Sequence, residues 1–313
     1  MRTAIKVMFS VVIAASCAAQ EVEIKVKGYH NGTLTFNQIS NAAYYRVDWA
    51  PKAHGPWSRT WASFQCIPAT ASNDDISVSV PNFYKVTAML KGTLFGLIAH
   101  YSFHERDAER ITDRSGRGNY GDLYGATWVE TNAMGGAYVF DGVDDYIELG
   151  RTDLYQALGQ LSGCAWINRS SRTMIVLSNY RGGASYNGYF DFIADDGAGN
   201  FYAGFGQGAG QMVRYLAAEK DIVPSNEWHH VAFTYDERRG SGQKIKLYLD
   251  GVARTNYIVQ GEGTGGPILQ TSDQLRIMAN RASGFGKGMI HDIMLFDRAL
   301  SDMDVKEIYE MEQ

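Results

Sequence analysis

The chain has 313 residues, a formal net charge of −5 at pH 7 and a hydrophobic content of 45%. This hydrophobic content is enough for a sizeable core, so the composition excludes a disordered chain. The acidic balance and the absence of any Lys/Arg cluster argue against nucleic acid or an anionic membrane as a partner. Glycine is abundant, with 34 residues, and proline is scarce, with 6, which indicates uninterrupted strands joined by tight turns.

Residues 1–19 have the pattern of a bacterial export signal. Two positively charged residues accompany an apolar stretch, residues 7–15, that is too short to span a bilayer. Cleavage after Ala19 would leave Gln20 as the first residue of a secreted protein. The alternative is lipoprotein anchoring through an acylated Cys17, although the Leu expected three residues before the cysteine is missing. No later segment is long and apolar enough to be a transmembrane helix.

The next part of the chain, residues 20–91, is predicted to be a small, separate β module. Its segments of alternating polar and apolar residues predict about five short strands. Residues 45–49 read Tyr-Arg-Val-Asp-Trp, and Gly-Pro-Trp follows at 55–57. This arrangement resembles fibronectin type III-like modules. The strand pattern lapses at residues 91–93, where we place the boundary with the second domain.

The most informative stretch, residues 227–251, predicts a β-hairpin. Residues 228–235 read Trp-His-His-Val-Ala-Phe-Thr-Tyr and residues 244–249 read Lys-Ile-Lys-Leu-Tyr-Leu. Both segments alternate with the period of a strand, because successive side chains leave opposite faces of a sheet. A charged, Gly-rich loop joins them, and Asp250-Gly251 supplies a second tight turn. Further short strands separated by turns predict a sandwich of two antiparallel sheets.

This hairpin resembles a signature of the LamG-like jelly rolls in the concanavalin A-like lectin/glucanase superfamily. Those domains carry Trp-x-His-Val-Ala-x-Thr-Tyr-Asp and then Leu-Tyr-Leu-Asp-Gly. Further similarities follow in the family's order, at residues 96–103, 113–121, 138–147, 290–296 and 298–301. The resemblance implies a jelly roll over residues 96–313 whose first and last strands, around Ala99 and Ile293, lie side by side. The predicted fold is therefore all-β: a small fibronectin-like β module followed by a two-sheet antiparallel jelly-roll sandwich.

Because the superfamily includes glucanases, paired catalytic carboxylates have to be considered. Retaining glycosidases need two carboxyl groups about 5–5.5 Å apart. Glu105, Asp107 and Glu109 have the alternating spacing that could supply them on a strand. The intervening residues are Arg106 and Ala108, however, and the segment lies in the loop after the first predicted strand. We therefore interpret it as a solvated charge run and expect no catalytic residues.

The resemblance also implies one structural calcium ion at the edge of the sandwich. In many LamG-like domains the loop after the first strand and an acid on the last strand hold this ion. The matching residues here are Asp113 and Asp292, and Asp141 and Asp144 are weaker candidates. Carboxylate and carbonyl oxygens are the ligands that calcium prefers. The alternative is that these aspartates form turns or lie on the surface of a strand.

Two Gly-rich runs, residues 179–189 and 204–211, have the composition of a sugar-binding rim. In such a rim, aromatic rings stand beside amides and carboxylates. The predicted ligand-binding residues are Tyr180, Tyr186, Asn187, Tyr189 and Gln207. The alternative for each tyrosine is packing inside the sandwich.

These observations predict an exported, non-catalytic recognition module that binds extracellular carbohydrate or glycosylated surfaces. The alternative is a structural or adhesive domain that binds a surface protein. A glucanase-like glycoside hydrolase is the third hypothesis. The fold alone does not choose among them, because one fold hosts many functions.

Overall fold

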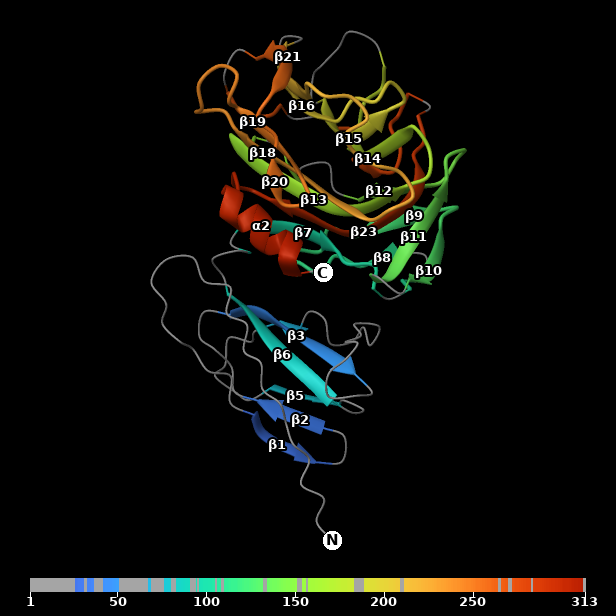
Figure 1. The fold of residues 1–313 in the computed structure, drawn as a ribbon, viewed down its shortest axis with the longest axis vertical. Helices are drawn as coiled ribbons and strands as arrows, with labels where there is room; N and C mark the ends of the chain where they lie inside the picture. Colours follow the sequence, from blue (N-terminus) through green and yellow to red (C-terminus); the bar gives the residue numbers. More distant parts are fainter. Residues whose placement is uncertain are drawn as a thin grey trace. The chain divides into compact units, whose positions relative to one another are not determined.

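The chain divides into two compact units, Met1–Phe95 and Gly96–Gln313 (Figure 1). The structure, a computed structural model, describes the backbone of six strands in the first unit. It also describes residue 94 and residues 96–311, apart from residues 105, 108–109, 132–133, 151–153, 156, 183–188, 209–210, 264–265, 270–271 and 283. Within these residues no helix is long and apolar enough to cross a membrane.

The described strands of the N-terminal unit form two small antiparallel sheets. The first has the order β1-β2-β5 and the second the order β4-β3-β6. Their bounds are β1 Val26–His30, β2 Thr33–Phe36, β3 Ala42–Ala50, β4 Ile67–Pro68, β5 Ile76–Ser79 and β6 Phe83–Leu90. The likeness of this unit to a fibronectin type III module stays a prediction.

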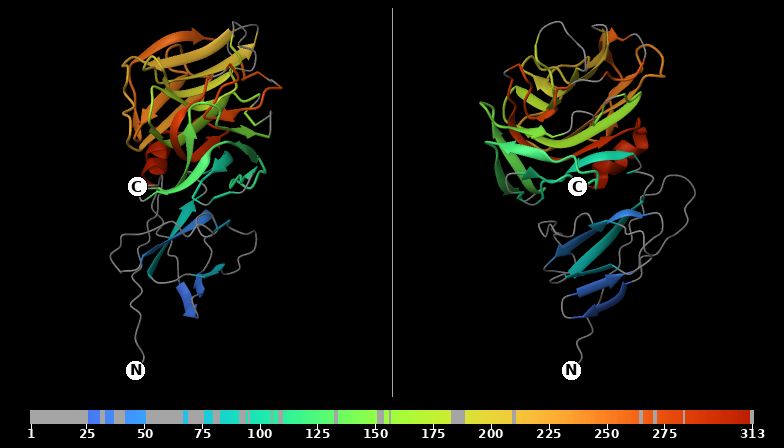
Figure 2. Two further views of the ribbon diagram at one scale, coloured as in Figure 1. Left: turned by 90° about the vertical axis from the view of Figure 1, so that its right-hand side faces the viewer. Right: turned by 180° about the vertical axis from the view of Figure 1, so that it is seen from behind.

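The C-terminal unit is built on two antiparallel sheets, seen as two layers in Figure 2. The eight-stranded sheet contains β7 Leu97–Tyr101, β10 Thr127–Thr131, β11 Gly135–Asp141, β13 Gln160–Arg169, β18 His229–Asp236, β19 Ile245–Leu249, β20 Val252–Ala253 and β23 Lys287–Phe296. The nine-stranded sheet contains β8 Arg110–Ile111, β9 Gly121–Tyr124, β12 Tyr146–Leu149, β14 Thr173–Ser178, β15 Phe190–Asp196, β16 Tyr202–Gly208, β17 Gln211–Ala217, β21 Tyr257–Glu262 and β22 Arg276–Ile277. The predicted all-β sandwich is confirmed.

Strand pairing agrees with the pattern of the sequence. The predicted hairpin is β18–β19, with Val231 opposite Leu249. The first and last strands of the unit are neighbours, because Ala99 on β7 pairs with Leu295 on β23. In the nine-stranded sheet the order is β21-β17-β16-β15-β14-β22-β12-β9-β8. This order brings together strands that are far apart in the chain.

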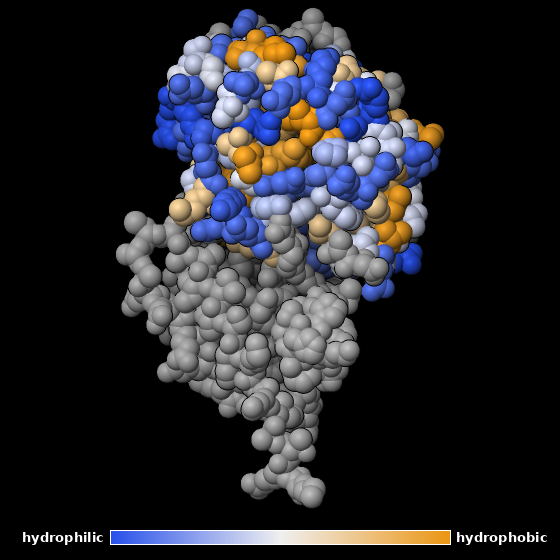
Figure 3. All heavy atoms as spheres, in the orientation of Figure 1, coloured by the Kyte–Doolittle hydropathy of each residue, from blue (hydrophilic) through white to orange (hydrophobic). Residues whose placement is uncertain are grey.

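The main core lies between the two sheets and is rich in aromatic rings. Phe233 on β18 contacts Phe192 and Phe205 of the other sheet, with ring centroids 4.9 and 5.3 Å apart. All three rings are fully buried. Each such side chain removes a large apolar area from water, which is the main driving force for closing the sandwich. On the outside of this unit, Figure 3 shows hydrophilic residues around separate hydrophobic patches.

The described helix α2, Asp302–Met311, packs on the outer face of the eight-stranded sheet. Its Tyr309 stacks on Trp166 of β13, with ring centroids 5.5 Å apart. The helix begins with a reciprocal cap: the Asp304 amide donates to Ser301 Oγ at 3.1 Å, and the Ser301 amide donates to Asp304 Oδ2 at 2.8 Å. Two backbone donors that the first turn leaves without helical partners are thereby satisfied.

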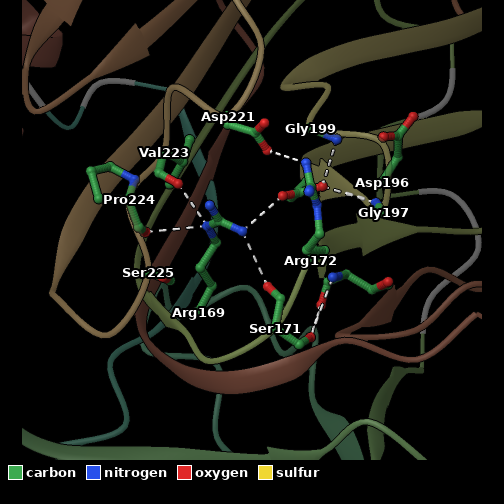
Figure 4. A network of polar contacts seen from close by, with 12 residues as sticks. Arg169, Ser171, Arg172, Asp196, Gly197, Gly199, Asp221, Val223, Pro224 and Ser225 are labelled. Atoms are coloured by element: carbon green, nitrogen blue, oxygen red, sulfur yellow. Dashed lines mark hydrogen bonds and ion pairs between the residues drawn. The ribbon is translucent and has the colours of Figure 1, made fainter.

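A buried ion pair joins the two sheets at one end of the sandwich (Figure 4). Arg169 Nη1, on β13, lies 2.7 Å from Asp195 Oδ2, on β15, and both side chains are almost fully buried. Arg169 Nε donates to the Val223 carbonyl at 2.6 Å. Asp195 Oδ1 accepts the amides of Gly197 and Gly199 at 2.9 and 3.0 Å. These hydrogen bonds compensate for the water that both charges lose on burial.

Candidate functional site

The outer face of the nine-stranded sheet carries a continuous row of charged and polar positions. Residues paired directly across antiparallel strands share a face of the sheet. The register therefore aligns, from β17 to β8, the residues Arg214, Gly204, Asp191, Ser178, Arg276, Glu148, Asp122 and Arg110. We call these eight residues the outer row. It contains three arginines and three acids, so it includes both hydrogen-bond donors and acceptors.

Asp191, in the outer row, is the most perturbed acid of this face. Its side chain is only 4% exposed. Its Oδ1 accepts the Ser178 hydroxyl at 2.5 Å, and its Oδ2 accepts the Tyr202 hydroxyl at 3.2 Å. Burial raises the pKa of Asp191 to about 6, although the hydroxyls of Ser178, Tyr189 and Tyr202 and the charge of Arg214 oppose this shift. The carboxyl group is therefore charged at neutral pH but gains a proton under mildly acidic conditions.

Two neighbouring side chains close over the strand next to Asp191. Arg214 lies on the ring of Tyr202, with its guanidinium carbon 3.9 Å from the ring centroid. A Cβ atom on Gly204 would come within 2.9 Å of Tyr189 Cε1 and 3.1 Å of Arg214 Cγ. Gly204, in the middle of β16, therefore leaves room for Tyr189 and Arg214 to lie close to the sheet. This explains why a glycine stands here, although glycine in the interior of a strand weakens it.

The centre of the outer row is a tight cluster of charges around Glu148. Its Oε1 atom accepts from Arg276 Nε at 3.0 Å and from Arg281 Nη2 at 2.7 Å. The guanidinium carbon of Arg276 also lies 4.2 Å from the ring centroid of Tyr146. A carboxylate held by two guanidinium groups is fixed in position and stabilised in its charged form.

The structure brings together two of the predicted sugar-binding residues. Tyr180 is half-buried and meets the buried Tyr189 edge to face, with ring centroids 5.7 Å apart. Both lie near Asp191: the Tyr180 amide donates to Ser178 Oγ at 3.0 Å, this hydroxyl donates to Asp191, and the charge of Asp191 adds to burial in raising the pKa of Tyr189. Tyr186 and Asn187 lie outside the described residues.

Gln207, the fifth predicted ligand-binding residue, faces the other side of the sheet. Its Nε2 donates to the Tyr235 hydroxyl at 2.6 Å and to the Gly266 carbonyl at 2.7 Å. Tyr235 comes from the opposite sheet, so this amide lies in the interior of the sandwich. The Gly-rich composition of residues 204–211 does not indicate which side chains point outward, and this is why the sequence did not separate Gln207 from the outer face.

The sequence analysis missed three side chains of this region: Asp191, Tyr202 and Arg214. One signal was available for Asp191, because it stands between Phe190 and Phe192 in an alternating segment. An acid at the outward positions of a strand is ordinary, however, and only the register shows that it meets the side chains of β14, β16 and β17.

The predicted calcium ligands Asp113 and Asp292 do not fit a cation as they are arranged here. Asp113 accepts four hydrogen bonds, from the His100 and Ser115 amides, the Ser115 hydroxyl and the Asn119 amide, at 2.8 to 3.0 Å. These donors fill the acceptor sites of a carboxylate, of which there are about four. Asp292 Oδ1 is paired with His100 Nε2 at 2.6 Å. Both acids therefore already have protein partners in place of an ion.

The weaker calcium candidates belong to a group of three aspartates. Asp141, Asp144 and Asp145 have carboxylate oxygens within 4.8 Å of one another. Asp141 Oδ1 accepts the Val143 amide at 2.7 Å, as in a turn that an Asp side chain stabilises. Asp145 Oδ2 accepts the Asp141 amide at 2.8 Å. Burial, opposed by this amide and reinforced by the charges of the two neighbouring acids, raises the pKa of Asp145.

The fold and these features can now be compared with known proteins. The family Laminin_G_3, described as the concanavalin A-like lectin/glucanases superfamily, matches residues 141–306. The chain belongs to this superfamily. None of the curated proteins is significantly similar to it in sequence.

Several solved structures share the fold at low sequence identity. Domain 4 of AbnA, a GH43 extracellular arabinanase from Geobacillus stearothermophilus solved in complex with arabinotriose, has a TM-score of 0.52 and 19% identity. That match covers 68% of this chain and 98% of the domain. The binding domain of Paraclostridial Mosquitocidal Protein 1 has a TM-score of 0.52 and 13% identity, and covers 70% of this chain and 53% of that one. The binding domain of Botulinum Neurotoxin DC, solved in complex with SialylT, has a TM-score of 0.51 and 13% identity, over 71% and 53% of the two chains. The chain thus spans about half the length of the two toxin domains, and at these identities the likeness shows the fold alone.

Proposed function

We propose that this protein is a non-catalytic recognition module that binds extracellular carbohydrate through the outer face of its nine-stranded sheet. The outer row is the observation that carries this proposal. Its fixed acidic and basic side chains lie beside the rings of Tyr202 and Tyr146, and the described helix α2 packs on the other sheet. Sugars need such a combination, because their hydroxyls require donors and acceptors while the apolar faces of their rings pack on aromatic side chains.

The geometry of the acids supports a binding role over hydrolysis. A glycosidase needs one carboxyl group that can donate a proton to the substrate and a second one as base or nucleophile. Asp191 is 4% exposed and surrounded by hydroxyls of its own protein, so it offers no free path to a glycosidic oxygen. Glu148 is held by two arginines. Neither side chain resembles an acid poised for proton transfer.

The export pattern of residues 1–19 supports a location of the proposed site outside the cytoplasm, in a secreted or surface-anchored protein. Extracellular carbohydrate is the ligand that such a location makes available. Two proteins of similar fold were solved in complex with arabinotriose and with SialylT, which supports a saccharide as the ligand class to test first. The export step can be checked by the intact mass of the mature protein, which should begin at Gln20.

A glycan array, followed by affinity electrophoresis in the polysaccharides that score, tests the proposal. We expect the wild-type protein to bind at least one saccharide class and Tyr180→Ala to lose this binding. Tyr309→Ala is the matched control, because Tyr309 is also half-buried but lies on α2, against the other sheet. Binding to no saccharide would overturn the proposal in favour of a protein-binding role, and release of reducing ends from a bound polysaccharide would overturn its non-catalytic part.

A further inference from the structure

Two exposed tyrosines stand at the two ends of β9 in the nine-stranded sheet: Tyr124 is its last residue and Tyr120 directly precedes its first. The exposed large hydrophobic residues among those described are five aliphatic side chains and two aromatic ones, Tyr120 and Tyr124, which are 41% and 42% exposed. Neither tyrosine belongs to the region around Asp191. A single exposed ring is ordinary, but two aromatic rings at the ends of one strand are close enough for one extended ligand to contact both, so the pair is a candidate binding site.

Both rings point to the outer face of the sheet. Tyr120, Asp122 and Tyr124 alternate along β9 and the residue before it, and Asp122 is a member of the outer row. The ladder continues through Tyr120, whose carbonyl accepts the Gly150 amide at 2.9 Å. Four residues of extended chain separate the two tyrosines by about 13 Å. We call Tyr120, Asp122 and Tyr124 the β9 strip.

Each ring of the β9 strip is supported by a neighbouring side chain. Tyr124 stacks on Tyr146, its partner on β12, with ring centroids 4.5 Å apart and planes inclined by 16°. Tyr120 lies under the guanidinium group of Arg110, at 4.7 Å from its centroid. Contact on one side fixes the orientation of each ring while much of its surface stays in water. A ligand that stacks on such rings therefore loses little side-chain entropy on binding.

We infer that the β9 strip is a stacking subsite for a neutral oligosaccharide, an inference that rests on the proposed carbohydrate-binding function. A sugar ring presents an apolar face to each tyrosine, and its hydroxyls can donate to Asp122 between them. The carboxylates of Asp122 and Glu148 are matched by Arg110, Arg276 and Arg281, so this part of the face has no strong net charge that would select a polyanion over a neutral chain. One sugar ring is about as long as one strand spacing, so a ligand that reaches both tyrosines has about three units.

The strip and the Asp191 region are separable on the sheet. The order β15-β14-β22-β12-β9 places four strand spacings between them, which amounts to about 19 Å. Substitutions in one region should therefore have effects that are independent of those in the other. A ligand that occupies only one region would reveal which of the two it uses.

Isothermal titration calorimetry with neutral linear arabino-, xylo- and cello-oligosaccharides, from disaccharide to hexasaccharide, tests the inference on the mature full-length chain. We expect the affinity of the wild type to increase with chain length. Tyr120→Ala and Tyr124→Ala should each weaken binding of the hexasaccharide about tenfold, because each removes one stacked ring. Binding of the disaccharide should change less. Tyr124→Phe should bind like the wild type, since it keeps the ring and loses only the hydroxyl.

Val252→Ala is the control for a general effect of altering an exposed apolar side chain, because Val252 lies on β20 in the other sheet and is 63% exposed. Wild-type affinity for the hexasaccharide in both alanine variants of the strip, together with loss of binding in Tyr180→Ala, would refute the strip and leave the proposed function standing. Failure of the wild type to bind any saccharide would overturn both.

Discussion

On the eight-stranded sheet, the outward-facing Trp166 and His230 are buried, and Tyr309 of α2 packs against both rings. On the nine-stranded sheet, the corresponding face presents the outer row, whose end on β9 and β8, at Asp122 and Arg110, is well exposed. Both faces belong to strands of the same sandwich. An antiparallel sheet needs only one buried face, so the chain covers one outer face with its own helix and keeps charges and tyrosines on the other. The comparison supports the second face as the proposed ligand-binding surface.

The largest expected effect tests the connection between the two sheets. Arg169→Ala removes one member of the buried ion pair and leaves Asp195 with an uncompensated charge. We expect a loss of about 3–5 kcal/mol in the free energy of unfolding, measured by chemical denaturation. Arg172→Ala is a matched control from the same cluster (Figure 4), because its pair with Asp221 is largely exposed and should contribute less than about 1 kcal/mol. Equal losses in the two variants would contradict the role of burial.

The covered face can be disrupted without touching the open one. Ile308→Ala removes a buried side chain of α2, which is 2% exposed, and should cost about 3 kcal/mol. Met303→Ala, on the exposed side of the same helix, should change stability by less than about 0.5 kcal/mol. Saccharide binding by Ile308→Ala, measured well below its melting temperature, should match the wild type. Lost binding in a folded Ile308→Ala protein would mean that the two faces are not independent.

The sequence predicts the core-facing residues of the sandwich much better than it predicts the members of the outer row. Strand alternation in residues 228–249 is enough to predict that Phe233 and Tyr235 face the core, because period two fixes the side of each residue. The members of the outer row lie between Arg110 and Arg276, and no local pattern connects them. They meet only through the order and register of the strands, which depend on packing across the whole sheet. Gln207 was misplaced for the same reason: the composition of residues 204–211 suggested a sugar-binding rim, whereas the position of Gln207 on its strand directs its side chain towards Tyr235.

The burial of Asp191 on the outer face of the nine-stranded sheet makes the free energy of unfolding depend on pH, and the sign of this dependence follows from the pKa shift. Because the folded state raises the pKa of this carboxyl from 3.8 to about 6, the native protein binds the proton more tightly than the unfolded chain. Its contribution to stability is therefore fully present below about pH 4 and is lost as the pH rises through about 6. We expect the wild type to lose on the order of 2 kcal/mol relative to Asp191→Asn between pH 4 and pH 7.

Thermal and urea unfolding of both proteins across this range measure that difference directly. Asp236 has the opposite shift, since Arg238 lowers the pKa of its carboxyl to about 2. Its stabilisation is lost only as the pH falls from about 4 towards 2, so the two windows do not overlap. A constant difference between the wild type and Asp191→Asn from pH 4 to pH 7 would show that Asp191 is not buried as described.

The smallest expected effect concerns calcium. Asp113 already accepts four hydrogen bonds and Asp292 Oδ1 is paired with His100 Nε2, so an ion would have to displace these partners. We expect a chelator to leave the melting temperature of the mature protein unchanged, because only an ion that binds the folded state would stabilise it. The variant Asp144→Asn distinguishes a calcium site in the three-aspartate group from one at Asp113 and Asp292. If calcium does raise the melting temperature, the effect should disappear in Asp144→Asn and persist in Asp292→Asn. Its loss in Asp292→Asn alone would restore the ligands that the family resemblance implied and would show that His100 gives up its partner to the ion.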